Sequence, residues 1–164
     1  MLGGLLATGL VCNQASAAIP SGLPQTSNIP TGRWYTSDHS AVIQISPCGQ
    51  NLCGQIVGIR LAHPGDPMPK DWQGQPQCGL IILQTQPERD SAGDISWVGS
   101  VLDPRNGNVY HATISLNADG KLLLHGYLGL PIFGQTQIWA RFHGHMHRDC
   151  KISAADDAPV NGGD

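Results

Sequence analysis

Charged residues are scarce in this sequence. Asp, Glu, Lys and Arg together make up 13% of the 164 residues, and the formal net charge is −3. Non-specific binding to nucleic acid and attachment to an anionic membrane surface both depend on clustered positive charge. The sequence has no polybasic segment. The composition therefore argues against nucleic acid as a partner and against binding to a charged membrane surface.

Catalytic motifs are missing as well. The sequence has no G-x-S-x-G nucleophile elbow, no H-E-x-x-H zinc motif, no P-loop and no G-x-G-x-x-G turn after a strand-like run. His111, His125, Asp103 and Ser115 are of types that serve as general acids or bases, but their spacing does not favour an assembled site. We expect a protein that is not an enzyme and has no resident cofactor.

A sustained helical pattern is the third absence, because no window repeats apolar side chains with a period of 3.6 residues. Short runs rich in β-branched and aromatic residues occur instead, and turn residues separate them. These runs are residues 33–36, 41–46, 53–60, 80–85, 95–102, 109–116, 122–128 and 136–142. The pairs Asn106-Gly107 and Asp119-Gly120 favour hairpin turns. The pattern predicts an all-β domain, a single eight-stranded antiparallel up-and-down barrel, with a β-sandwich as the alternative.

The N-terminal 17 residues resemble an export signal. They carry no charge, contain an apolar run and end in Ala15-Ser16-Ala17, which has the A-x-A form of a cleavage site. A basic n-region is missing, and the apolar run is too short to span a bilayer. We expect residues 1–17 to be a signal peptide, cleavage to leave no transmembrane anchor, and the mature protein to be periplasmic or secreted. Lipidation at Cys12 or retention as an anchor are the alternatives.

Removal of the signal would leave four cysteines, Cys48, Cys53, Cys78 and Cys150. An even number in an oxidising compartment suggests disulfides. A Cys48–Cys53 bridge would staple a hairpin. Cys78 with Cys150 would then tie a long loop to the C-terminal tail, and this bridge would stabilise the fold by roughly 4 kcal/mol in the loop-entropy model. A zinc site made of cysteines is the alternative, but the paired C-x-x-C spacing is missing.

Three further segments complete the predicted organisation. Residues 18–31 are rich in Pro, Ser and Gly and predict a flexible leader before a barrel domain of residues 32–142. Residues 62–79 form a Pro-rich loop whose four prolines exclude a central strand, and we interpret it as a lid or binding element around Trp72. Residues 143–164 predict a His-rich, largely disordered tail.

Several motifs resemble those of a family of small exported bacterial proteins, domain of unknown function 2147. They are Gly32-x-Trp34, the stretch from Cys48 to Gly54, "LDPRNGNVY", "GYLG" and "TQIWAR", and the resemblance runs from Gly32 to about Phe142. It implies a lipocalin-like, calycin-type barrel and no established activity. It also implies a structural role for Trp34 and Arg141, the guanidinium covering the indole at the closed end, a contact of about 0.5–2 kcal/mol.

Three histidines alternate in the segment "ARFHGHMHRDC". If the last strand continued past Phe142, a period of two would place His143, His145 and His147 on one face. Imidazoles at that spacing, with Met146 or Asp149 nearby, would suit Zn²⁺, Cu²⁺ or Ni²⁺. A solvated tail is the alternative.

The preferred functional hypothesis is an exported lipocalin-like protein that binds a small hydrophobic or amphipathic molecule. Its candidate ligand-binding residues are Trp72, Trp97, His111 and Tyr127. The polar face of the run 109–116, which includes His111, would make a polar pocket if it pointed inward. An outward orientation is favoured because antiparallel strands usually expose one face to solvent. The alternatives are an envelope structural or interaction module with a filled barrel, and a metal-binding protein using the C-terminal histidines.

Overall fold

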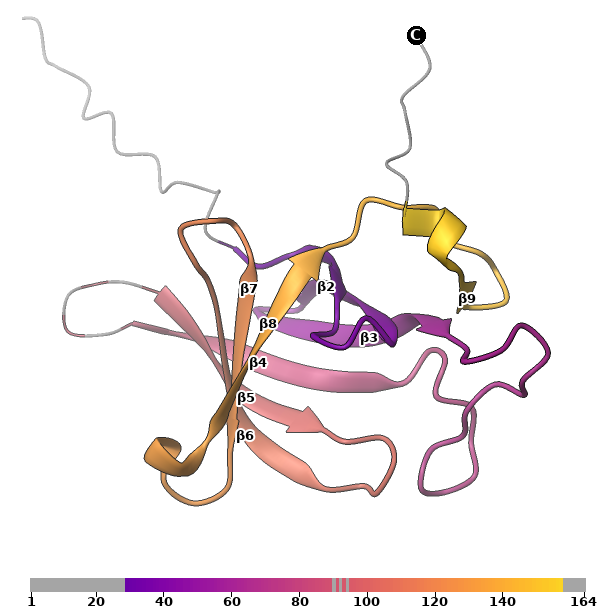
Figure 1. Ribbon diagram of the computed structural model, residues 1–164. Helices are drawn as coiled ribbons and strands as arrows, with labels where there is room; N and C mark the ends of the chain where they lie inside the picture. The colour runs from indigo at the N-terminus through magenta and orange to yellow at the C-terminus, as the bar shows by residue number, and fades with distance from the viewer. Residues whose placement is uncertain (1–28, 90, 92, 94, 158–164) are drawn as a thin grey trace, which may run out of the picture.

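The computed structural model describes residues 29–89, 91, 93 and 95–157 (Figure 1). The predicted signal peptide, residues 18–28 of the leader, Cys12 and the last seven residues of the tail lie outside the described residues. No helix in the described part of the chain is both long and apolar enough to cross a bilayer.

Eight antiparallel strands make up the domain, as the sequence predicted. They are β1 (Gly32–Tyr35), β2 (Ala41–Cys48), β3 (Asn51–Arg60), β4 (Ile81–Arg89), β5 (Ile95–Leu102), β6 (Val109–Leu116), β7 (Leu122–Tyr127) and β8 (Gln135–Arg141). The β2–β3 hairpin is longer than expected because Cys48 pairs with Asn51 across a two-residue turn. Gly49 adopts a φ of 71° in this turn, a conformation that glycine reaches without steric cost.

The strands close into a barrel. Consecutive strands pair in chain order, and β1 pairs with β8 through Trp34 opposite Arg141 and Tyr35 opposite Ala140. Each of the eight strands therefore has two strand neighbours, and no edge is left open. This confirms the barrel and excludes the sandwich.

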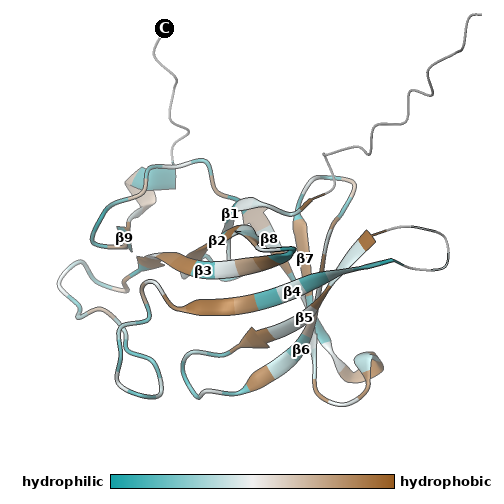
Figure 2. Ribbon diagram, turned by 180° about the vertical axis from the view of Figure 1, so that it is seen from behind, coloured by the Kyte–Doolittle hydropathy of each residue, from teal (hydrophilic) through white to brown (hydrophobic). Residues whose placement is uncertain are grey.

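The barrel core follows from the alternation of side chains along the strands. Ile43 and Ile45 of β2 and Ala112 and Ile114 of β6 are buried, whereas His111, which precedes Ala112 on β6, is exposed. Figure 2 shows apolar and polar residues interleaved along the strands. The polar face of β6 thus points outward, as favoured from the sequence.

The Pro-rich loop is held by hydrogen bonds around the side chain of Asp71. The buried Asp71 accepts hydrogen bonds through Oδ1 from the backbone N–H groups of Gln73 and Gln75, at 2.9 and 2.8 Å. The backbone N–H of Trp72 donates to the carbonyl of Pro104 at 3.0 Å. The loop therefore packs against the β5–β6 turn.

Residues 143–157, hereafter the C-terminal extension, differ from the prediction of a largely disordered tail. They contain β9 (Lys151–Ile152), which pairs in parallel with the end of β3, and a short 3-10 helix η3 (Ala154–Asp157). The extension lies beside β2 and β3 at the end of the chain (Figure 1). Disulfides join Cys48 to Cys53 and Cys78 to Cys150, with Cα–Cα distances of 5.8 and 6.2 Å. The first is the pairing that the spacing suggested, and the second is the one that this pairing leaves. The second bridge ties the extension to the Pro-rich loop.

A second hydrophobic cluster explains why the extension is ordered. Tyr35 and Val42 point away from the barrel interior, yet both are buried, because Phe142 and Ile152 pack on them. Met146 packs against the same cluster. Burial of large apolar side chains of this kind contributes about 1.5–3 kcal/mol each to stability. The polar composition of the C-terminal segment does not reveal this packing.

Candidate functional site

The barrel interior contains a cavity of about 660 Å³. Its deep wall is formed by large apolar side chains that point inward from six strands. They are Ile43, Ile56, Ile82, Val101, Leu124 and Trp139. The indole Nε1 of Trp139 donates to Oε1 of Gln137, which also lines the cavity, so its polar atom is satisfied without a ligand. The wall offers an apolar surface with few unpaired polar groups.

Polar residues from two turns surround the mouth. The β1–β2 turn contributes Asp38, and the β5–β6 turn contributes Asp103 and Arg105. Arg105 donates to both carboxylate oxygens of Asp103, at 3.0 and 2.8 Å, and these hydrogen bonds hold the pKa of Asp103 below its usual value. The two charges of this pair offset each other, so the carboxylate of Asp38 gives the mouth a net negative charge.

The β7–β8 connection adds an apolar rim. Leu128 and Phe133 line the cavity although their exposed fractions are 62% and 78%. Phe133 belongs to the 3-10 helix η2 (Pro131–Phe133), in which Ile132 is 82% exposed. These residues were not among the sequence candidates. The signal that could have found them is the run of large apolar residues in "LGLPIF", in a segment too rich in turn residues to be a strand.

The four predicted ligand-binding residues do not form one site. Tyr127 lines the cavity at the end of β7. His111 stacks on the ring of Tyr127, with centroids 5.3 Å apart, but is exposed and does not line the cavity. Trp97 is a buried core residue outside the cavity lining. Trp72 lies over Gly107 instead of roofing the mouth, and Gln77 is the member of the Pro-rich loop that lines the cavity in the described structure.

The end at which β1 begins and β8 ends is closed by Trp34 and Arg141. The guanidinium carbon of Arg141 lies 3.8 Å from the centroid of the Trp34 ring, and Arg141 also donates to the carbonyl of Thr31. The indole of Trp34 is fully buried and donates to the carbonyl of Pro30 at 3.0 Å. Burial lowers the pKa of Arg141, which still leaves it charged near neutral pH. The last residues of the predicted leader thus belong to the fold, and the arrangement is the one that the resemblance implied.

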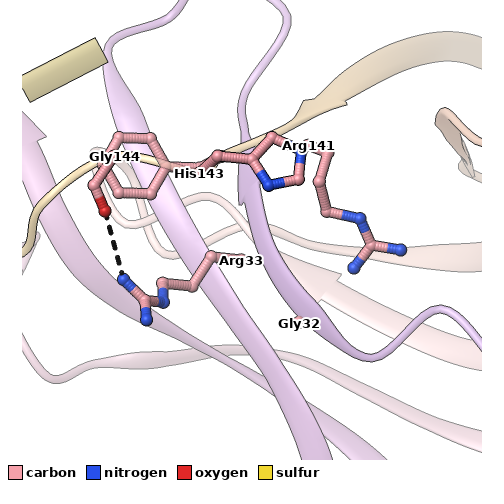
Figure 3. Close-up of a pocket in the computed structure, with 6 residues that line it drawn as sticks. Gly32, Arg33, Arg141, His143 and Gly144 are labelled. Carbon is pink, nitrogen blue, oxygen red and sulfur yellow. Dashed lines mark hydrogen bonds between the residues drawn. The ribbon is translucent and has the colours of Figure 1, made fainter. Parts of the chain in front are cut away.

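The three candidate metal-binding histidines separate into two places. His143 lies in a shallow pocket with Arg33 and Arg141, where Arg33 reaches the carbonyl of Gly144 (Figure 3). His145 and His147 come together with Asp156, which the sequence reasoning did not include. The predicted set of three is wrong about His143 because β8 ends at Arg141, so the strand alternation does not continue through the histidines.

An ion-pair network holds η3 on the barrel. Arg60 of β3 donates to both carboxylate oxygens of Asp157, at 2.8 and 2.9 Å, and to the hydroxyl of Tyr35 at 2.9 Å. The Tyr35 hydroxyl donates to Asp157. Burial and this hydrogen bond raise the pKa of Tyr35 to about 12, while the hydrogen bond from Tyr35 and the contact with Arg60 lower the pKa of Asp157.

These shifts predict a pH dependence of stability at both extremes. The folded protein holds the Tyr35 proton more tightly than the unfolded chain does, so this contribution is complete below pH 10.0 and is lost as the pH rises to about 12. Asp157 acts in the opposite sense, and its contribution is lost as the pH falls below the ordinary value of 3.8. Thermal unfolding followed against pH should show a shallower alkaline decline in Tyr35→Phe and a shallower acid decline in Asp157→Asn. Tyr127→Phe, which removes a tyrosine hydroxyl outside this network, is the control and should keep the wild-type profile.

A closed antiparallel barrel of eight strands, hollow at one end and sealed at the other by an arginine on a tryptophan, defines a lipocalin-like protein. The chain belongs to the DUF2147 family, whose model is described as "uncharacterized protein conserved in bacteria" and matches residues 32–141. Among solved structures, protein HP1028 from the human pathogen Helicobacter pylori, described as belonging to the lipocalin family, is similar to this chain with a TM-score of 0.55 and 15% identity. The match covers 69% of this chain and 82% of that one, and at this identity it shows the fold alone. No curated protein matches the sequence.

Proposed function

We propose that this protein binds a small amphipathic molecule in the barrel cavity. The observation that carries the proposal is the cavity of about 660 Å³ with an apolar wall and a polar mouth. Sites for small molecules are concave, mostly apolar and about 300–1,000 Å³ in volume, with a few polar groups that orient the ligand. A barrel whose own side chains filled its interior would leave no space of this size, so the cavity favours a binding protein over a purely structural module.

The charges at the mouth indicate which polar group the ligand carries. Asp38 and Asp103 are acidic and Arg105 is basic, while the other residues that line the cavity are uncharged at neutral pH. Arg105 is already paired with Asp103. The mouth therefore has an excess of one negative charge, which repels an anionic head group. We expect an uncharged or cationic head group at the mouth and a hydrocarbon portion against Ile43, Ile56 and Leu124.

Export to the periplasm or the extracellular space is part of the proposal. Two disulfides in a chain of this size support it, because such bonds persist in oxidising compartments and are rare in the cytosol. The family is bacterial, and its barrel is the part of the chain that carries the cavity. The proposal includes no catalytic step, and binding alone is what the cavity is expected to do.

The test is a substitution that fills the cavity without strain. Gly126 lines the cavity, and a Cβ at this position would meet its nearest neighbours, the His111 carbonyl oxygen and a Val101 methyl group, at 3.9 Å. Gly126→Leu should therefore fold and should weaken ligand binding by at least about tenfold, because its side chain takes the ligand's space. Gly65→Leu is the matched control, since a Cβ at Gly65 has no described neighbour within 4 Å and lies in the exposed loop.

The measurement is a fluorescence titration, in which Trp139 of the cavity wall reports on binding. The probes are a monoacylglycerol, an alkyltrimethylammonium salt and a fatty acid of the same chain length. We expect the neutral and cationic probes to bind more tightly than the fatty acid to the wild-type protein and to the Gly65→Leu variant. Equal binding by wild type and Gly126→Leu, or no binding of any probe by the wild type, would contradict the proposal.

A further inference from the structure

The C-terminal extension brings three metal-ligating side chains together outside the cavity. One ligand atom from each of His145, His147 and Asp156 lies within 4.8 Å of the others. The rings of the two histidines have centroids 4.9 Å apart. All three residues follow residue 141, where the match to the family model ends, so the cluster lies outside the matched region.

We propose that His145, His147 and Asp156 form a binding site for one divalent transition-metal ion, with Zn²⁺ as the ion that the ligand set suits best. Two imidazole nitrogens and one carboxylate oxygen are ligands that Zn²⁺ accepts in tetrahedral sites. Three protein ligands leave the fourth position to water or to an external ligand. The harder ions Mg²⁺ and Ca²⁺ prefer sites made of oxygen atoms and are not expected to bind here.

Asp156 is already oriented for this role. Its Oδ2 accepts hydrogen bonds of 2.7 Å from both the backbone N–H and the hydroxyl of Ser153, which leaves Oδ1 directed to His147 Nε2 at 2.7 Å. Hydrogen bonds to the distal oxygen of a ligating carboxylate fix its direction and support metal binding. Ser153 is therefore a positioning residue that acts through Asp156.

The backbone around the cluster is held by contacts to the barrel. Asp157, next to Asp156, pairs with Arg60 at 2.8 Å, and the carbonyl of Cys150 accepts from the N–H of Ile59 at 2.7 Å. Gly144 allows the start of the extension to approach η3 closely, because a Cβ at Gly144 would collide with the carbonyl oxygen of Asp156. The three ligands therefore come from a docked segment, although the histidines are exposed.

A small movement completes the site. Tetrahedral Zn²⁺ with bonds of about 2.0–2.1 Å separates its ligand atoms by about 3.4 Å. The present separations between the ligand atoms are all within 4.8 Å, and the exposed side chain of His145 can rotate to adjust them. His145 makes no hydrogen bond to the residues that the structure describes, so its ring nitrogens are open to an ion. The ion would replace the hydrogen bond between His147 and Asp156.

A simpler role for the cluster is an ordinary hydrogen bond that stabilises the extension. The His147–Asp156 contact alone would do this, and it would not involve His145. The two roles differ in their response to His145→Ala, which removes a metal ligand but breaks no hydrogen bond to the described residues.

The experiment is a calorimetric titration of the full chain with ZnCl₂. The protein is purified without a histidine tag and carries Cys12→Ser, which removes its one cysteine outside the two disulfides. We expect one ion per chain. His145→Ala, His147→Ala and Asp156→Asn should each weaken binding by about 100-fold, and Ser153→Ala by about tenfold, as for the loss of outer-shell partners. Co²⁺ in place of Zn²⁺ should give the visible absorption of a tetrahedral site, which a merely structural role would not produce.

Two histidines serve as controls. His143→Ala removes the histidine that lies outside the cluster, and His63→Ala removes one that lies beside a carboxylate, Asp66, at 3.2 Å. Both variants should bind one Zn²⁺ with wild-type affinity. Circular dichroism and the melting temperature without metal show whether each ligand variant keeps its fold. Absence of Zn²⁺ binding in the wild type, or a folded His145→Ala variant with unchanged affinity, would overturn the proposal.

Discussion

Replacement of Trp34 by Ala is expected to destabilise the protein by about 3–5 kcal/mol, the range for removal of a fully buried tryptophan from a core. The side chain has no exposed surface and belongs to the main hydrophobic cluster of the barrel. The substitution also removes the contact with the guanidinium of Arg141 at 3.8 Å and leaves the carbonyl of Pro30 without its hydrogen bond from the indole. Urea unfolding followed by far-ultraviolet circular dichroism measures the loss.

Trp72→Ala is the matched control, since it removes the same side chain from an exposed position. Trp72 is 43% exposed and lies over Gly107 in a turn. Its loss should cost about 1 kcal/mol or less, near the range of surface substitutions. If Trp34→Ala does not fold, Trp34→Phe keeps part of the packing and should show a smaller loss in the same direction. Equal losses at Trp34 and Trp72 would contradict the assignment of Trp34 as the residue that closes the barrel end.

Removal of the Cys78–Cys150 disulfide is expected to cost more than removal of Cys48–Cys53. The first bridge spans 72 residues and the second spans five. In the loop-entropy model these lengths correspond to about 4 and about 2 kcal/mol, because the longer loop restricts the unfolded chain more. The double variants Cys78→Ala with Cys150→Ala and Cys48→Ala with Cys53→Ala compare the two bridges under the same denaturation conditions.

The two double variants should also differ in what they loosen. Cys150 is buried next to the backbone pairing of β9 with β3, so loss of its bridge should increase amide exchange across the C-terminal extension. The Cys48–Cys53 bridge closes the tip of one hairpin and should affect β2 and β3 near that tip. A larger loss of stability from the short bridge, or unchanged exchange in the extension after loss of the long one, would contradict this assignment.

Local patterns predicted much of the fold. Each of the eight strands is a short run whose side chains alternate between the interior and the surface, and glycine-containing turns join several of them. The outward face of β6 followed from the same alternation, since His111 carries a polar side chain that solvent can hydrate. The contact between Trp34 and Arg141 was implied by motif resemblance, because sequence spacing alone does not place residues 107 positions apart in contact.

The cavity was predicted only as a possibility. A period of two assigns a side chain to a face of the sheet, but it does not show at which end of the barrel the inward side chains leave space. That depends on how residues such as Ile82, Leu124 and Trp139 from three different strands fill the same volume. Trp97 was a candidate ligand-binding residue, yet it is buried in the core cluster among side chains from other strands.

The sequence by itself determined the features that depend on neighbours along the chain. These are the eight strands, their turns, and the division of their side chains between an inward and an outward face. Only the tertiary structure decided where the space inside the barrel lies and that His147 meets Asp156 rather than His143. The physical reason is that these arrangements depend on packing between distant segments. Phe142 and Ile152 cover Tyr35 and Val42, and that burial turns a polar C-terminal segment into an ordered part of the protein.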